Sequence, residues 1–228
     1  MHTHRLSIHE ARRIAVRAGL LGPERPADLL EVVRHLSFVQ IEPTAAVAPT
    51  ADLVLWSRLG DAYAPGELLE TLEGGDTLFE LSLMVRPMED LALYRAEMAG
   101  PPRHESTLRW LEDNAEFRDD VLARLDEDGP LVATEIADSS VVPWPSSGWN
   151  NNRNVVMMLE FLAARGEAAV TGRRGRDRLW DLAERRYHAD IPTVPLEEAV
   201  RLRNERRLRA LGIVRNRTTE LPVESVRV

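Results

Sequence analysis

The sequence predicts a mainly α-helical protein with small β-hairpins. Twice along its 228 residues, three helix-forming segments are followed by a short stretch that can form two strands. In the second of these stretches, EAAVTGRRGRDRLWDLAE, two strand-forming segments flank a Gly-Arg-Arg-Gly turn over residues 172–175. Three helices followed directly by a hairpin is the order of a winged helix-turn-helix. The expected fold class is therefore a tandem array of winged helix-turn-helix units.

The first unit is expected over residues 1–103. SIHEARRIAVRAGLLG predicts a helix, because Ser7 and Glu10 have the spacing of a capping box. ADLLEVVRHLSFVQIEP predicts a second helix that ends at or before Pro43, since proline disfavours the helical conformation of the preceding residue. TADLVLWSRLG predicts a third, closed by Gly60.

The same unit ends with a short helix, a hairpin and a further helix. APGELLETLEGG predicts the short helix. TLFELSLMVRP has the apolar and β-branched character of a strand or hairpin, and MEDLALYRAEM is again helical.

The second unit is expected over residues 104–190. EFRDDVLARLDEDGP predicts a helix, LVATEIADS a short second helix, and RNVVMMLEFLAARG a third that ends at Gly166. The segment SSVVPWPSSGWNNNRN reads as a polar insertion in the turn before the third helix. Residues 191–228 supply one basic amphipathic helix, PLEEAVRLRNERRLRALGI, and are interpreted as the start of an incomplete third unit.

Composition excludes several classes of function. The chain has no cysteine, and its six histidines lack the spacing of metal ligands, so neither a metal site nor any other cofactor is expected. No apolar run is long enough to cross a membrane and no secretory signal is visible, which predicts a cytoplasmic protein without a membrane partner.

Charge is distributed unevenly along the chain. All 29 basic residues are arginine, so no lysine can form a Schiff base with an opened sugar. The net charge is −8, yet residues 61–140 carry twenty acids against six arginines, whereas residues 165–217 carry fourteen arginines against eight acids. A polyanion is therefore expected to meet the second stretch.

The predicted second hairpin and the insertion supply the candidate DNA contacts. Arginines at the hairpin would neutralise phosphates, although a solvated hairpin tip is the alternative. Trp144 and Trp149 in the insertion could stack on bases or simply anchor the loop. The candidate DNA-binding residues are Arg173, Arg174, Arg176, Arg178, Trp149, Asn150, Asn152 and Arg153.

The candidate catalytic residues are Gln40 and Glu42, which flank Ile41 just before Pro43. A carboxylate can take a proton from water or stabilise an oxocarbenium-like sugar, while a neighbouring amide orients that water. The alternative is structural, because polar residues at a helix end before proline are common.

Three segments together resemble the bacterial winged-helix DNA glycosylases of the AlkZ/YcaQ type: FVQIEPTAAVAPTADLVLWSRLG, LFELSLMVRPMEDLALYRAEM and NVVMMLEFLAARGEAAVTGRRGRDRLWDLAERRY. The resemblance covers nearly the whole chain. That family combines tandem winged helices with a β-barrel, and here the sequence predicts two units, one helix of a third and no barrel, as in a C-terminally truncated member. The family signature, glutamine, an apolar residue, then glutamine or aspartate, falls on Gln40, Ile41 and Glu42.

The resemblance implies hydrolysis of the N-glycosidic bond of alkylated purines in double-stranded DNA, including interstrand crosslinks. An N7-alkylated purine is cationic and leaves its sugar readily, so one carboxylate and an oriented water can suffice. Glu42 would then be the base or electrostatic stabiliser and Gln40 would position the water. Glutamate keeps the carboxylate of the aspartate version but adds a methylene.

Two other functions fit the same sequence. A non-catalytic winged-helix DNA-binding protein, such as a transcriptional regulator, would use Gln40 and Glu42 only to finish a helix. An interaction scaffold would present the acidic middle of the chain to a protein partner.

Overall fold

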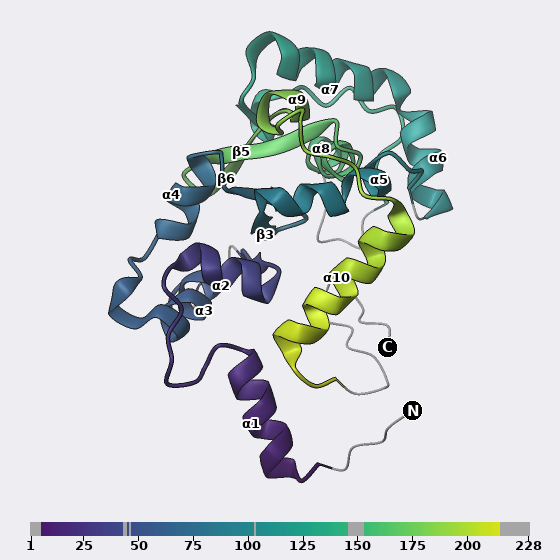
Figure 1. The fold of residues 1–228 in the computed structure, drawn as a ribbon. Helices are drawn as coiled ribbons and strands as arrows, with labels where there is room; N and C mark the ends of the chain where they lie inside the picture. Colours follow the sequence, from purple (N-terminus) through teal and green to yellow (C-terminus); the bar gives the residue numbers. More distant parts are fainter. Residues whose placement is uncertain (1–5, 43–44, 46, 103, 146–152, 215–228) are drawn as a thin grey trace.

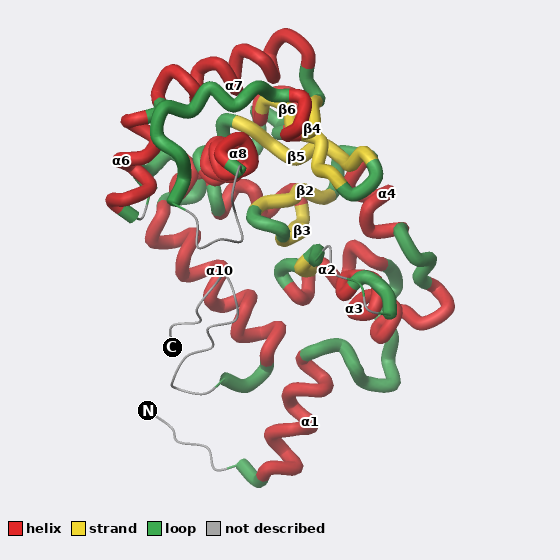
Figure 2. The backbone as a smooth tube through the Cα atoms, turned by 180° about the vertical axis from the view of Figure 1, so that it is seen from behind, coloured by secondary structure: helices red, strands yellow, loops and turns green. Residues whose placement is uncertain are grey.

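The computed structural model describes residues 6–42, 45, 47–102, 104–145 and 153–214, and it is mainly helical with two small antiparallel sheets of three strands each. The two sheets lie next to each other, with strand β5 of the second sheet beside strand β2 of the first (Figures 1 and 2). The predicted fold class is confirmed to this extent.

The first unit is built around the sheet of strands β1, β3 and β2, in that order. Its elements are α2 (Leu29–Leu36), β1 (Val39–Gln40), α3 (Thr50–Leu59), η1 (Gly60–Ala62), α4 (Glu67–Glu73), β2 (Leu78–Leu81) and β3 (Met84–Pro87). Helices α2, α3 and α4 pack on the apolar face of this sheet, where Val32, Leu55 and Val85 are fully buried. Burial of such side chains contributes about 1.5–3 kcal/mol each.

Strand β1 corrects the prediction of one helix extending toward Pro43. Helix α2 ends at Leu36, because Ser37 has a φ of 71° and turns the chain out of the helix. Val39 and Gln40 then pair with Val85 and Met84 of β3. Gln40 therefore lies on a strand and not at a helix end.

A connecting region joins the two units. It contains η2 (Met88–Leu93), α5 (Arg95–Met98) and α6 (Glu105–Asp113). The single helix expected from MEDLALYRAEM is thus a 3-10 helix followed by one helical turn, and α6 was not predicted.

The second unit repeats the order of the first: a helix, a short strand, two helical segments and a hairpin. Its elements are α7 (Ala115–Asp128), β4 (Leu131–Val132), η3 (Ala133–Glu135), α8 (Asn154–Ala164), β5 (Ala168–Arg174) and β6 (Asp177–Leu182). The sheet order is β4, β6, β5, which matches the order β1, β3, β2 of the first unit. The short helix predicted for LVATEIADS is instead β4 and one 3-10 turn.

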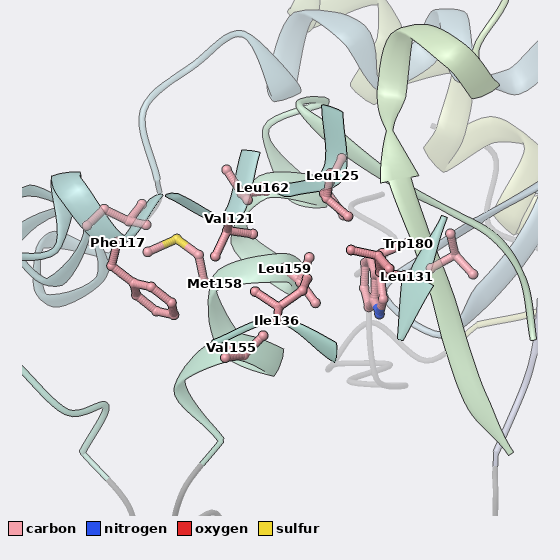
Figure 3. Close-up of a cluster of buried hydrophobic side chains, with 14 of the residues drawn as sticks. Phe117, Val121, Leu125, Leu131, Ile136, Val155, Met158, Leu159, Leu162 and Trp180 are labelled. Atoms are coloured by element: carbon pink, nitrogen blue, oxygen red, sulfur yellow. The ribbon is translucent and has the colours of Figure 1, made fainter. Parts of the chain in front are cut away.

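Helix α8 forms the centre of the second core (Figure 3). Its residues Met158, Leu159 and Leu162 are fully buried against α7 and against Trp180 of β6. The strongly apolar sequence of this helix follows from burial on nearly all sides.

Helix α9 (Ala183–Arg186) is followed by the long helix α10 (Leu196–Leu211), which runs back across the molecule to the first unit (Figure 1). Helix α10 packs on α2 and η2, and its end meets α1 (Ile8–Ala18), whose predicted capping box between Ser7 and Glu10 is present. Within the described residues, the segment expected to start a third unit is this helix docked on the first unit. No described helix is long and apolar enough to cross a membrane.

Candidate active site and DNA-binding surface

The Gln40 to Glu42 segment is organised by strand β1. Successive side chains of an extended chain point to opposite faces. Ile41 is accordingly buried in the first core with 9% exposure, while Gln40 is half-buried and Glu42 is exposed. The Nε2 atom of Gln40 donates a hydrogen bond of 2.7 Å to Oε1 of Glu42. The amide and the carboxylate thus form one polar unit that faces away from the core.

The hairpin turn between β2 and β3 supports this segment. The N–H group of Ile41 donates to the carbonyl of Leu83 at 2.8 Å. Ser82 and Leu83 form that turn with φ angles of 53° and 61°, a backbone region that non-glycine residues seldom adopt. Such strained residues cluster at functional sites.

Two arginines from parts of the chain that are distant in sequence contact Phe38, which lies just before strand β1. The ring of Phe38 lies under the guanidinium of Arg207 from α10, with 4.7 Å between Cζ and the ring centroid. The guanidinium of Arg86 lies 5.6 Å from the same centroid. Residues two apart on an extended segment share a face, so these cations lie near Gln40.

Arg173 and Arg178, predicted to bind phosphate, are engaged inside the protein. Nη2 of Arg173 lies 2.6 Å from Oε2 of Glu80, and Arg178 pairs with Glu160 and lies 3.7 Å from the other oxygen of Glu80. The side chains of Arg173 and Arg178 are 10% and 15% exposed, and that of Glu80 is fully buried. The positive charges of these two arginines are compensated at the contact between the units.

Arg174 and Arg176 lie at the accessible end of the hairpin. Arg174 is 57% exposed and pairs with Glu135 at 2.6 Å. The turn consists of Gly175 and Arg176, so the predicted turn of residues 172–175 is displaced toward the C-terminus, and Gly175 supplies the positive φ of 64°. Arg176 is exposed and has no acidic partner among the described residues.

The remaining predicted contacts lie around the start of α8. Trp149, Asn150 and Asn152 fall outside the described residues. Arg153 is exposed at the N-cap of α8. Trp144 packs edge-on against Trp110, with 5.3 Å between ring centroids, so it anchors the described first part of the insertion.

Arg186 was not among the sequence predictions, although it makes extensive contacts between the units. It is almost fully buried on α9 and donates to the carbonyls of Leu72, Gly75 and Leu78 in the first unit. Burial lowers the pKa of its guanidinium below the ordinary value, yet arginine remains charged at neutral pH. Only the pairing of distant segments shows this role, since its local sequence AERRY has no distinguishing pattern.

The chain belongs to a family of DNA-repair enzymes, to judge from its match over residues 33–218 to the family described as DNA glycosylase AlkZ-like. It is thus a member of the AlkZ-like DNA glycosylase family. The resemblance seen in the sequence is confirmed.

A solved structure shares the fold. Streptomyces sahachiroi DNA glycosylase AlkZ superposes with a TM-score of 0.64 at 19% sequence identity, covering 91% of the present chain. The present chain spans 58% of the length of that protein.

Among the described residues no group of acidic or histidine side chains could hold a metal ion.

Proposed function

We propose that the protein is a monofunctional DNA glycosylase that hydrolyses the N-glycosidic bond of alkylated purines in double-stranded DNA. The observation that carries this proposal is the hydrogen-bonded pair of Gln40 and Glu42 at the end of β1, on the side away from the first core. Family membership supplies the DNA substrate, and the pair supplies groups that can orient and deprotonate a water.

Both units are proposed to be winged helices. Each has the order helix, strand, two helical segments and hairpin, and each sheet has its first strand beside the last. In this fold the hairpin contacts the DNA backbone next to the helix that precedes it. Arg174, Arg176 and Arg153 are the predicted arginines that remain exposed for this purpose.

The proposed reaction needs no acid. An N7-alkylated purine carries a positive charge and departs as a neutral base, which leaves an oxocarbenium-like sugar. The Glu42 carboxylate stabilises this sugar and accepts a proton from the water that attacks it, while Gln40 holds the water. Since the chain has no lysine, the expected product is an uncut abasic site.

The test uses a duplex that contains a single 7-methylguanine. The protein is incubated with it, and abasic sites are then cleaved with alkali and measured on a gel. We expect Glu42→Gln to lower the rate of excision at least about tenfold, since general base catalysis typically contributes about 10²–10⁴-fold. DNA affinity should change little, because the carboxylate contributes no attraction to phosphate.

Glu112→Gln on α6 is the matched control, because Glu112 is an exposed glutamate in the connecting region. Excision at the unaltered rate by the Glu42 variant would remove Glu42 from the mechanism. Wild-type protein that binds the duplex but releases no base would leave a non-catalytic DNA-binding protein as the function, and crosslinked duplexes can be assayed in the same way.

A further inference from the structure

A cavity of about 240 Å³ lies where the two units and α10 meet. Its walls come from the turn of the first hairpin, the segment after α5, the end of α8 and the middle of α10, with Leu81, Met98, Phe161, Ala164, Arg165 and Arg203 among the lining residues. Sites for drug-sized ligands usually measure about 300–1,000 Å³. This cavity suits a smaller group, such as a single ring or a short branched chain.

The cavity lies on the same face of the first sheet as Gln40. Gln40 pairs with Met84, and Met84 pairs with Leu81, so the three side chains form one row across β1, β3 and β2. Neighbouring strands are about 4.8 Å apart, which places Gln40 roughly 10 Å from Leu81 at the cavity wall.

The strained turn joins the cavity to the candidate active site directly. Ser82 lines the cavity, and the carbonyl of Leu83 accepts the hydrogen bond from Ile41. A group in the cavity that contacts Ser82 is therefore next to Leu83. The carbonyl of Leu83 holds the backbone between Gln40 and Glu42.

The lining favours an uncharged, apolar group. Leu81, Met98 and Phe161 supply apolar and aromatic surface. The three guanidiniums at the cavity are held by the protein: Arg86 donates to the carbonyl of Leu81 at 2.8 Å, Arg203 to Glu97 at 2.8 Å, and Arg165 to Glu167 at 2.6 Å. Their positive charge disfavours a cationic purine inside the cavity, whereas a ring can lie against Phe161 or a guanidinium face.

We propose that this cavity receives the apolar substituent carried by the alkylated purine, while the purine itself stays beside Gln40 and Glu42. This inference rests on the proposed glycosylase function. A substituent on N7 projects away from the glycosidic bond, so it can enter a neighbouring cavity while the bond remains at the catalytic pair.

The experiment compares two duplexes, one with N7-methylguanine and one with N7-benzylguanine at the same position. Ala164→Trp fills the cavity from α8, where Ala164 is exposed and the larger side chain can be accommodated without entering the core. Ala123→Trp is the matched control, since Ala123 is an exposed alanine on α7 that lines a different hollow. Ala164→Leu is a smaller second variant.

We expect Ala164→Trp to lower kcat/KM for the benzyl substrate roughly tenfold or more relative to the methyl substrate, the discrimination that one apolar pocket provides. Ala164→Leu should give a smaller change in the same direction, and Ala123→Trp should leave the ratio of the two substrates at its wild-type value.

Equal effects of both Ala164 variants on the two substrates, or no effect on either, would overturn the cavity as the substituent site while leaving the glycosylase function intact. Failure of the wild-type protein to release either base would overturn the proposed function, and the substituent site with it.

Discussion

At the end of strand β1, the half-buried Gln40 and the exposed Glu42 lie on either side of Ile41, which is fixed in the core. The longer side chain of glutamate, compared with aspartate, allows its carboxylate to meet the Gln40 amide at 2.7 Å. This hydrogen bond fixes the position of the carboxylate relative to the amide. That position matters, because a displacement of about 1 Å can cost about 10²-fold in rate.

Ser82 and Leu83 give a prediction at the same scale. A two-residue turn with positive φ at both positions favours Asn-Gly, and neither serine nor leucine adopts that region readily. Replacing the pair by Asn-Gly should raise the free energy of unfolding by about 1 kcal/mol, measured by urea denaturation.

The control for that replacement is Ser57→Asn on α3, where an exposed serine has helical backbone. If the Asn-Gly protein were no more stable than the wild type, packing by the Leu83 side chain would outweigh the relief of strain. Its excision rate would show in addition whether the strain contributes to activity.

The hairpin of β5 and β6 carries both buried and exposed arginines, and the two kinds have different expected roles. Arg173→Ala leaves the fully buried Glu80 without its closest partner and should lower the free energy of unfolding by about 3 kcal/mol. Arg176→Ala removes an exposed cation and should leave stability unchanged, while reducing the salt dependence of DNA binding by about one unit of slope.

Urea denaturation and DNA-binding titrations at several salt concentrations measure the two effects on the same proteins. If the Arg173→Ala protein were as stable as the wild type but bound DNA more weakly, Arg173 would be a DNA-binding residue and not a structural one. An unchanged salt slope for Arg176→Ala would place the DNA elsewhere.

At the level of elements, most helices follow from local sequence. The capping box at Ser7 and Glu10, the stop at Gly60 and the apolar run of α8 each place a helix correctly. The hairpins are also visible, since each contains an apolar strand, LFEL in β2 and the start of AAVTGRR in β5.

The elements that were missed depend on partners distant in sequence. The apolar residues of β1 continue the pattern of α2, and only the φ of Ser37 and the pairing with β3 separate them. Likewise Leu131 and Val132 form a strand because β6 lies beside them. The sequence selects Gln40 and Glu42 as candidate catalytic residues, and that role stays a prediction. The buried pairing of Arg173 and Arg178 with Glu80 could not be predicted, because nothing local shows that the second hairpin meets the first sheet.

For the whole molecule, the contacts between the units predict that both unfold together. Glu80 with Arg173, Arg186 with three carbonyls, and α10 with α2 join segments from both halves of the chain. Arg186→Met keeps most of the side-chain volume but removes the hydrogen bonds to the carbonyls of Leu72 and Leu78. The carbonyl of Leu72 still accepts from the N–H group of Gly75 at 3.3 Å, and the expected cost is about 1–3 kcal/mol.

The measurement uses a Trp56→Phe background, because every other tryptophan lies beyond residue 103. Fluorescence then reports the second unit together with α6, whose Trp110 packs in the second core, and far-ultraviolet circular dichroism reports the whole chain. We expect coincident urea transitions in this background and separated ones after Arg186→Met. Transitions that still coincide would show that the remaining contacts are sufficient to make the two units unfold together.

The alternation of β1 makes the polar pair dependent on sequence register as well as on residue type. Deleting a single residue upstream of Gln40, with the pairing to β3 retained at the strand's start, would rotate the segment by half a turn. Isoleucine would then meet water, and a carboxylate or an amide would be pressed among Val32, Leu55 and Val85. Shortening this strand by one position should therefore abolish both folding and chemistry.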